Sequence, residues 1–144
     1  KLAYLAWHDP LTGLGNRALL HQRLGEAVET ANHGGAATAV LVWDVKRFST
    51  VNDSLGRDAG DALLRELSRR LARLWPELSD MARLSADKFG GLIRDNPDAP
   101  RVGHLLERSA AALTEPFVVY ATEITIDICV AIALRPTTVR DRPA

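Results

Sequence analysis

The 144-residue sequence predicts a single α/β domain, a sandwich of helices on a largely antiparallel sheet. Three observations predict this fold class. An unbroken apolar run over residues 37–45 indicates a buried strand, stripes of apolar residues at helical spacing lie before and after it, and residues 81–93 have the pattern of a β-hairpin. Hydrophobic residues make up 47% of the chain, which is enough for the core of one domain.

The first elements are predicted from apolar spacing and turn residues. Residues 1–8 carry apolar side chains at helical spacing and are interpreted as the end of a helix that enters from an upstream part. After a stretch of turn formers, Asn16 is expected to cap a helix that ends at residues 32–35. The apolar side of this helix consists of Leu20, Leu24, Ala27 or Val28, and Ala31. Residues 37–45 follow as a strand covered on both faces.

The middle of the chain is predicted to hold a second helix and the hairpin. A polar, glycine-containing segment over residues 51–61 leads into a helix that starts near Asp61 and is stopped by Pro76. The apolar stripe of this helix is Leu64, Leu67, Leu71 and Leu74. In the hairpin, two short apolar runs flank a four-residue tip, residues 85–88.

The last third is predicted to return from a helix to strands. Residues 95–100 are a loop by composition, and apolar spacing predicts a helix over residues 102–113. Residues 117–120 and 123–134 are expected to pair as antiparallel strands across the short turn between them. Residues 135–144 contain two prolines and no periodicity, so they are interpreted as a tail or linker.

Composition argues against several classes of function. The 18 Lys and Arg balance the 18 Asp and Glu, so no broad basic surface for nucleic acid is expected. No apolar stretch approaches the ~20 residues of a membrane span, so this segment is not expected to contact a membrane. The four histidines lack the spacing of metal ligands. Cys129 lies in an apolar run and is interpreted as a buried small hydrophobic residue in a reducing, cytoplasmic compartment.

Two aspartates at strand ends suggest a ligand site. Asp44 ends the buried strand, and Asp87 lies at the hairpin tip beside Lys88. Carboxylates in such places bind a divalent cation and, through it, phosphate groups. The alternative is that Asp44 only terminates its strand, while Asp87 and Lys88 form an exposed ion pair that contributes little.

Four stretches of the chain together resemble the GGDEF domain of diguanylate cyclases. They are Asp-Pro-Leu-Thr-Gly-Leu-Gly-Asn-Arg at residues 9–17, Asp44 through Phe48 to Asn52-Asp53, Gly-Arg-Asp-Ala-Gly-Asp at residues 56–61, and Arg-Leu-Ser-Ala-Asp-Lys-Phe at residues 83–89. The resemblance implies a palm-like, mostly antiparallel central sheet with helices on both faces. Active members of the family join two GTP molecules into cyclic di-GMP across a dimer interface.

The resemblance also implies a domain organisation. Residues 1–8 would be the end of an upstream signalling helix, residues 9–134 a GGDEF domain that lacks the family's final helix, and residues 135–144 a tail or linker. Such domains often precede an EAL phosphodiesterase domain. The expected partners are therefore an adjacent EAL or sensor domain and a second copy of the chain.

Site residues follow from the same match. Asp44, the Val45 carbonyl and Asp87 correspond to metal ligands of the family, and one Mg²⁺ at most is expected here. Asn52 and Asp61 correspond to the residues that read the guanine edge of GTP or GDP, and Phe48 and Leu55 would form an apolar floor. The alternative for Asn52 and Asp61 is that they cap the turn and the helix near Asp61.

The chain departs from the family at its signature hairpin. Ser85 and Ala86 replace two glycines, and each Cβ takes room that the family uses for close approach to phosphates. Lys88 replaces a glutamate, which changes the local charge by two units. Two unit charges ~4 Å apart interact by about 4 kcal/mol at an effective dielectric constant of ~20. The hairpin is therefore expected to be degenerate, with Ser85, Ala86, Asp87, Lys88 and Phe89 supplying no complete catalytic set.

These observations predict a catalytically inactive GGDEF domain that acts as a regulatory or interaction module in bacterial cyclic di-GMP signalling, with GTP or GDP as its expected ligand. Two alternatives stay open. The first is a weak diguanylate cyclase, or another Mg²⁺-dependent nucleotidyl transferase acting on GTP, that uses Asp44 and Asp87 with Lys88 on a phosphate. The second is a scaffold domain that binds no ligand.

Overall fold

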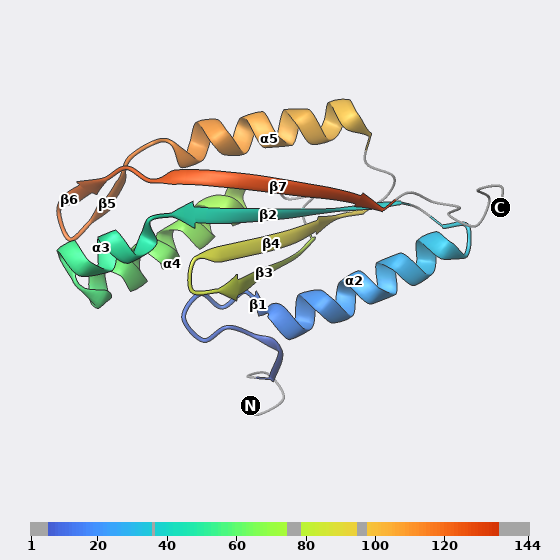
Figure 1. The fold of residues 1–144 in the computed structure, drawn as a ribbon, viewed down its shortest axis with the longest axis horizontal. Coiled ribbons are helices and arrows are strands. Elements are labelled where there is room, and N and C mark those ends of the chain that lie inside the picture. Colours follow the sequence, from blue (N-terminus) through green and yellow to red (C-terminus); the bar gives the residue numbers. More distant parts are fainter. Residues whose placement is uncertain (1–5, 36, 75–78, 95–97, 136–144) are drawn as a thin grey trace.

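A computed structural model of the chain describes residues 6–35, 37–74, 79–94 and 98–135. Within these residues a central sheet is formed, in spatial order, by β1 (Gly15–Asn16), β3 (Ser79–Ser85), β4 (Lys88–Ile93), β2 (Thr38–Lys46) and β7 (Asp127–Arg135). The helices are α2 (Arg17–Asn32), α3 (Phe48–Leu55), α4 (Arg57–Leu74) and α5 (Ala99–Leu113). A separate hairpin consists of β5 (Phe117–Val119) and β6 (Thr122–Ile124). Figure 1 shows the sheet between helices.

The sheet is mostly antiparallel, as predicted. β2 pairs with β4 on one side and with β7 on the other, both antiparallel, and β3 pairs with β4 in the same way. β1 is short and runs parallel to β3. Among the described residues β2 therefore lies inside the sheet and β7 lies at its edge (Figure 1).

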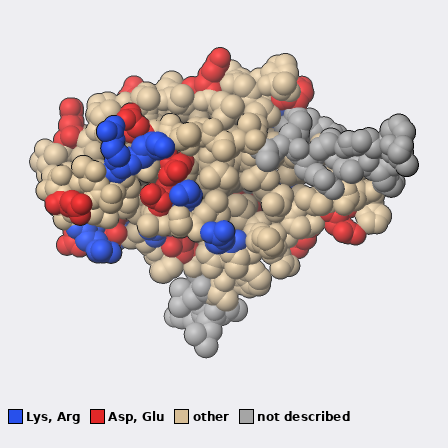
Figure 2. Space-filling view, in the orientation of Figure 1, with Lys and Arg blue, Asp and Glu red and all other residues tan. Residues whose placement is uncertain are grey.

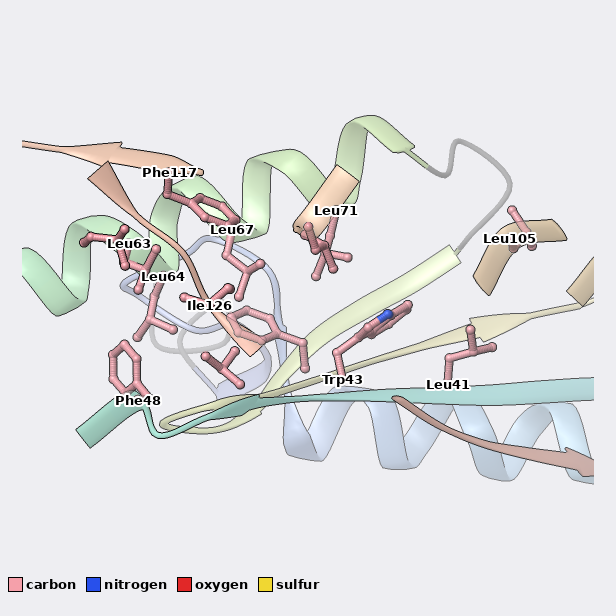
Figure 3. Close-up of a cluster of buried hydrophobic side chains, with 14 of the residues drawn as sticks. Leu41, Trp43, Phe48, Leu63, Leu64, Leu67, Leu71, Leu105, Phe117 and Ile126 are labelled. Atoms are coloured by element: carbon pink, nitrogen blue, oxygen red, sulfur yellow. The ribbon is translucent and has the colours of Figure 1, made fainter. Parts of the chain in front are cut away.

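Alternate residues of β2 face two separate apolar layers. Leu41, Trp43 and Val45 are buried against the leucines of α4, whereas Val40 packs in a smaller cluster with Leu20 of α2. This alternation follows from the two-residue period of a strand. The larger layer is shown in Figure 3, where the side chains of Leu63, Leu64, Leu67 and Leu71 point from α4 towards β2. Each such buried leucine contributes about 2 kcal/mol through removal of apolar surface from water.

Helices therefore cover both faces of the sheet, as predicted. α4 and α5 contribute to the larger core together with Phe117 and Ile126, and α2 covers part of the opposite face. The N-terminus of α2 is capped as expected, because Asn16 Oδ1 accepts a hydrogen bond of 2.9 Å from the Leu19 amide. No helix within the described ranges is long and apolar enough to cross a membrane.

The segment between β2 and α4 corrects the sequence prediction. Residues 48–55 form the helix α3, whereas residues 51–61 were expected to be a polar, glycine-containing segment without a helix. α4 begins at Arg57 and not near Asp61. Gly56 separates the two helices with a φ of 96°, a conformation that favours glycine. Pro76, expected to stop α4, lies outside the described residues, and α4 ends at Leu74.

The C-terminal strands pair differently from the prediction. β5 and β6 form a hairpin whose two-residue turn is Tyr120-Ala121, one residue earlier than expected. The chain then leaves this hairpin, and β7 joins the central sheet beside β2. As a result Cys129 is exposed on the edge strand, so its interpretation as a buried residue is wrong.

Helix α5 also starts earlier than predicted. Asp98 caps it by accepting a hydrogen bond of 2.8 Å from the Arg101 amide, and Pro100 lies in its first turn. Residues 98–100 therefore belong to the start of a helix and not to the expected loop, whereas residues 95–97 are outside the described ranges.

Candidate functional site

The candidate site lies where β2 ends beside the turn between β3 and β4. Asp44 of β2 is directly opposite Lys88, the first residue of β4. The amide of Val45 donates a hydrogen bond of 2.9 Å to the carbonyl of Asp87 in the turn. Sheet register therefore brings Asp44, Val45 and Asp87 together, as the sequence predicted.

The ammonium of Lys88 lies between the two carboxylates. Its Nζ is 3.7 Å from Asp44 Oδ2 and 3.9 Å from Asp87 Oδ1. The sequence predicted the pair with Asp87, whereas the approach to Asp44 follows from the register of β2 and β4. The Lys88 side chain is 47% exposed, so each pair is screened by water and contributes at most about 1 kcal/mol to stability.

The hairpin turn is tighter than predicted. β3 extends to Ser85 and β4 begins at Lys88, so the loop is the two residues Ala86 and Asp87. Neither Ser85 nor Ala86 has a positive φ, so this turn does not require glycine. Ser85 Oγ donates a hydrogen bond of 3.4 Å to Asp87 Oδ1, which holds the carboxylate at the tip.

The tip residues do not fit a divalent ion in this arrangement. Mg²⁺ and Ca²⁺ need several oxygen ligands at about 2.0–2.6 Å. Across the described ranges, no group of three or more His, Cys, Asp or Glu side chains is placed to hold a metal. At the tip, an ammonium already lies between the two available carboxylates. That Asp44, Val45 and Asp87 hold one Mg²⁺ stays a prediction, and such an ion would have to displace Lys88.

The predicted base-binding residues come from α3 and α4. Asn52 of α3 packs directly on Gly60 of α4, so closely that a Cβ at position 60 would overlap Asn52 Oδ1. Phe48 is 6% exposed and borders the same contact. Asn52 Oδ1 is buried and has no hydrogen-bond partner among the described residues.

Asn52 and Asp61 do not cap a helix end. Asn52 lies inside α3, and Asp61 is the fifth residue of α4. The carboxylate of Asp61 is half-buried and makes no hydrogen bond or ion pair with another described residue. Leu55 is 43% exposed at the end of α3. The capping interpretation is therefore wrong, and the role of Asn52 and Asp61 in reading a guanine edge stays a prediction.

A partly buried ion pair joins the N-terminal turn to the hairpin tip. Arg83 Nη1 lies 3.3 Å from Asp9 Oδ1, and Arg83 Nη2 donates a hydrogen bond of 3.1 Å to the Ala86 carbonyl. The other oxygen of Asp9 accepts hydrogen bonds from the amide and hydroxyl of Thr12. The sequence did not single out this pair, although both residues lie in matched stretches, 9–17 and 83–89.

Surface charge does not single out another site on the face shown in Figure 2. Basic and acidic side chains are interspersed there, and neither sign gathers into a broad patch. On this face the charge distribution reflects the balance of 18 basic and 18 acidic residues in the sequence.

Comparison with known proteins relates this geometry to a family. A family model described as "Diguanylate cyclase, GGDEF domain" matches residues 6–143. The bifunctional diguanylate cyclase/cyclic di-GMP phosphodiesterase MucR of Pseudomonas aeruginosa is 36% identical over 138 residues, in an alignment that covers 94% of this chain and 20% of MucR. Diguanylate cyclase TpbB of the same species is 33% identical over 137 residues, covering 94% of this chain and 32% of TpbB.

A solved structure supports the same relation. The GGDEF domain of TpbB from Pseudomonas aeruginosa superimposes with a TM-score of 0.83 at 32% sequence identity, covering 90% of this chain and 76% of that domain's chain. The sequence therefore aligns with one domain of much longer proteins, since it spans 20% of MucR and 32% of TpbB.

Proposed function

Because this chain belongs to the GGDEF domain family, we propose that it serves cyclic di-GMP signalling as a regulatory module that does not itself make cyclic di-GMP. The observation that carries this proposal is the position of Lys88. Family members that act as cyclases are expected to bind two cations where Asp44 and Asp87 lie. Here the ammonium of Lys88 lies 3.7 and 3.9 Å from those carboxylates.

Loss of catalysis follows from the charge at the tip. A metal-assisted transfer needs cations that neutralise the phosphates and activate the attacking hydroxyl. A lysine adjacent to both carboxylates repels a second cation, and it brings no carboxylate oxygen to receive the proton of the attacking hydroxyl. A glutamate in this position would instead attract a second cation and could receive that proton. The chain is thus left without a general base and with a weakened metal site.

The base-binding half supports a sensing role. Asn52 and Asp61 present an amide and a carboxylate that match the donors and acceptors of a guanine edge. Asn52 Oδ1 is buried without a hydrogen-bond partner in the described part of the chain, so turning this amide towards a ligand would break no hydrogen bond of that oxygen. Phe48 and Leu55 lie on the same helix as Asn52 and would form the apolar floor. We therefore propose GTP or GDP as the ligand.

A neighbouring domain is the proposed recipient of that signal. MucR, which this chain matches over 20% of its length, is named as a bifunctional cyclase and phosphodiesterase. An EAL phosphodiesterase or a sensor domain is therefore the proposed partner, together with a second copy of this chain.

Two measurements on purified protein test this function. Incubation with GTP and Mg²⁺ or Mn²⁺, followed by chromatography, is expected to show no cyclic di-GMP, with an active GGDEF cyclase as positive control. Calorimetry is expected to show binding of GTP and GDP that is lost in Asn52→Ala. Formation of cyclic di-GMP by the wild type, abolished by Asp44→Ala, would overturn the inactive assignment.

The second candidate is a weak cyclase or another nucleotidyl transferase. The retention of Asp44 and Asp87 at one end of the sheet is the observation that favours it. In that case Asp44→Ala abolishes turnover of GTP, whereas in the inactive module neither Asp44→Ala nor Lys88→Glu changes the products. A chain that binds neither nucleotide would instead be a scaffold domain.

A further inference from the structure

We propose that the ammonium of Lys88 is a cation built into the chain, which takes the place of a divalent metal ion between Asp44 and Asp87. The site would then bind nucleotide without metal. This inference rests on the proposed function for its nucleotide ligand, but its effect on metal binding is measured separately. It deepens that function by naming what excludes the metal and which ligand chemistry remains.

The backbone places Lys88 directly opposite Asp44. Lys88 and Asp44 are cross-strand partners in β4 and β2, so their Cβ atoms are held about 5 Å apart on one face of the sheet. Asp87 precedes Lys88 in the turn, and its carbonyl accepts the Val45 amide at 2.9 Å. Sheet register thus places the base of the Lys88 side chain beside both aspartates, and its ammonium lies within ion-pair distance of each carboxylate.

The ammonium of Lys88 is within ion-pair distance of two carboxylates. The Nζ atom lies 3.7 Å from one carboxylate and 3.9 Å from the other, and the two carboxylates belong to different elements. Ser85 Oγ donates to the same Asp87 oxygen, which keeps that carboxylate turned to the tip. A group tethered beside its partners acts at an effective concentration on the order of millimolar, without any need for uptake from solution.

The charge balance favours the lysine over a metal. Asp44 and Asp87 contribute two negative charges and Lys88 one positive charge. A divalent ion entering this group meets a like charge about 4 Å away, or must first push the ammonium into water. Because the side chains are partly exposed, this repulsion weakens metal binding without making it impossible.

The net charge of these three side chains also determines which ligands the tip favours. With no metal ion between the tip and the phosphates, each further phosphate of a nucleotide meets a tip with one net negative charge. Affinity should therefore come from the guanine base at Asn52 and Asp61 and should not rise from GDP to GTP. Added Mg²⁺ should leave both affinities unchanged to within about threefold, because screening alone has small effects at this exposure.

The direct test is Mn²⁺ binding, read from the loss of the free-ion electron paramagnetic resonance signal on titration with protein. Lys88→Ala is expected to tighten Mn²⁺ binding by about tenfold or more over wild type, as one like charge about 4 Å away is removed from a water-screened site. Lys88→Gln removes the charge but keeps a polar side chain only one atom shorter, and it should give the same gain. Adding Asp44→Asn to Lys88→Ala should remove this gain in Mn²⁺ affinity.

A matched control comes from the same strand. Lys46 lies two residues after Asp44 on β2, is exposed, and makes no ion pair with any described residue. Lys46→Ala removes the same unit charge at a greater distance from the two carboxylates, so it should strengthen Mn²⁺ binding by less than Lys88→Ala does. Circular dichroism of each variant confirms that the comparison is made on folded protein.

The outcomes separate this inference from the proposed function. Equal Mn²⁺ affinities in wild type and Lys88→Ala, or an equal gain in Lys46→Ala, would overturn the role of Lys88. A tenfold gain in GTP affinity on addition of Mg²⁺ to wild type would overturn it as well. Absence of cyclic di-GMP is a separate measurement, so either idea can fail while the other stands.

Discussion

The close contact between Asn52 and Gly60 predicts the effect of adding one methyl group at position 60. Gly60 lies in the first turns of α4, is buried, and has Asn52 and Phe48 of α3 packed against its Cα. In Gly60→Ala the new Cβ would overlap Asn52 Oδ1 and lie 3.0 Å from Asn52 Cγ and 3.2 Å from Phe48 Cζ. Something in α3 must therefore move.

Two opposing effects decide the sign. Alanine is favoured over glycine inside a helix by about 1 kcal/mol. Overpacking a buried contact costs about 1–3 kcal/mol, and Phe48 is buried, so it has little room to give way. We expect Gly60→Ala to lower the free energy of unfolding by about 1 kcal/mol, and to weaken GTP and GDP binding because Asn52 is displaced.

Two other helical glycines provide the controls. Gly25 in α2 and Gly103 in α5 would each place a Cβ in open space. Gly25→Ala and Gly103→Ala should therefore stabilise the protein by up to about 1 kcal/mol, which corresponds to an increase of about 3 °C in melting temperature. Urea and thermal unfolding measure all three variants. A stabilising Gly60→Ala of the same size would refute the close packing of α3 on α4.

Three further variants test other contacts by thermal and urea unfolding. Ala121→Gly should stabilise the protein by about 1 kcal/mol, because Ala121 has a φ of 64° in the β5–β6 turn, and an unchanged midpoint would contradict that geometry. Arg70→Lys should destabilise the protein by about 1–2 kcal/mol, since Arg70 donates to three backbone carbonyls and its Cζ lies 3.6 Å from the centroid of the Phe117 ring. An unfolding midpoint equal to that of the wild type would show these contacts to be dispensable. Arg83→Ala should lower the free energy of unfolding by about 1–2 kcal/mol, because both side chains of the Arg83–Asp9 pair are less than one-fifth exposed. Proteolysis should then cut more quickly near the hairpin tip. Cleavage at the wild-type rate would argue that this pair does not hold the tip to the N-terminal turn.

Elements with strong local signals were predicted well. The cap at Asn16, the apolar stripe of α4 and the two runs of the hairpin are each set by residues close in sequence. α3 was missed because its sequence, Phe-Ser-Thr-Val-Asn-Asp-Ser-Leu, is rich in turn formers and has Phe48 as its buried residue. Packing on α4 stabilises this helix, and sequence periodicity does not contain that information.

Strand partners were harder to predict than strands. Periodicity indicated residues 123–134 as extended, but it carries no information on whether they pair with β5 or with β2. Consequently the exposure of Cys129 was predicted wrongly. At the site, Asp44 and Asp87 were brought together as predicted because Asp44 lies near the end of β2 and Asp87 lies in the adjoining turn between β3 and β4. The place of Lys88 beside Asp44 depended on the register between β4 and β2, which only the structure provides.

The same register offers a way to observe the site. Lys88, Asp44 and Cys129 are cross-strand neighbours on β4, β2 and β7, and Cys129 is the chain's single cysteine and is exposed. A maleimide fluorophore would therefore attach at one position, on the residue facing Asp44, with no prior mutagenesis. Its emission would respond to any ion or nucleotide phosphate arriving at that aspartate. The protein thus has a natural labelling position next to Asp44 of the candidate site.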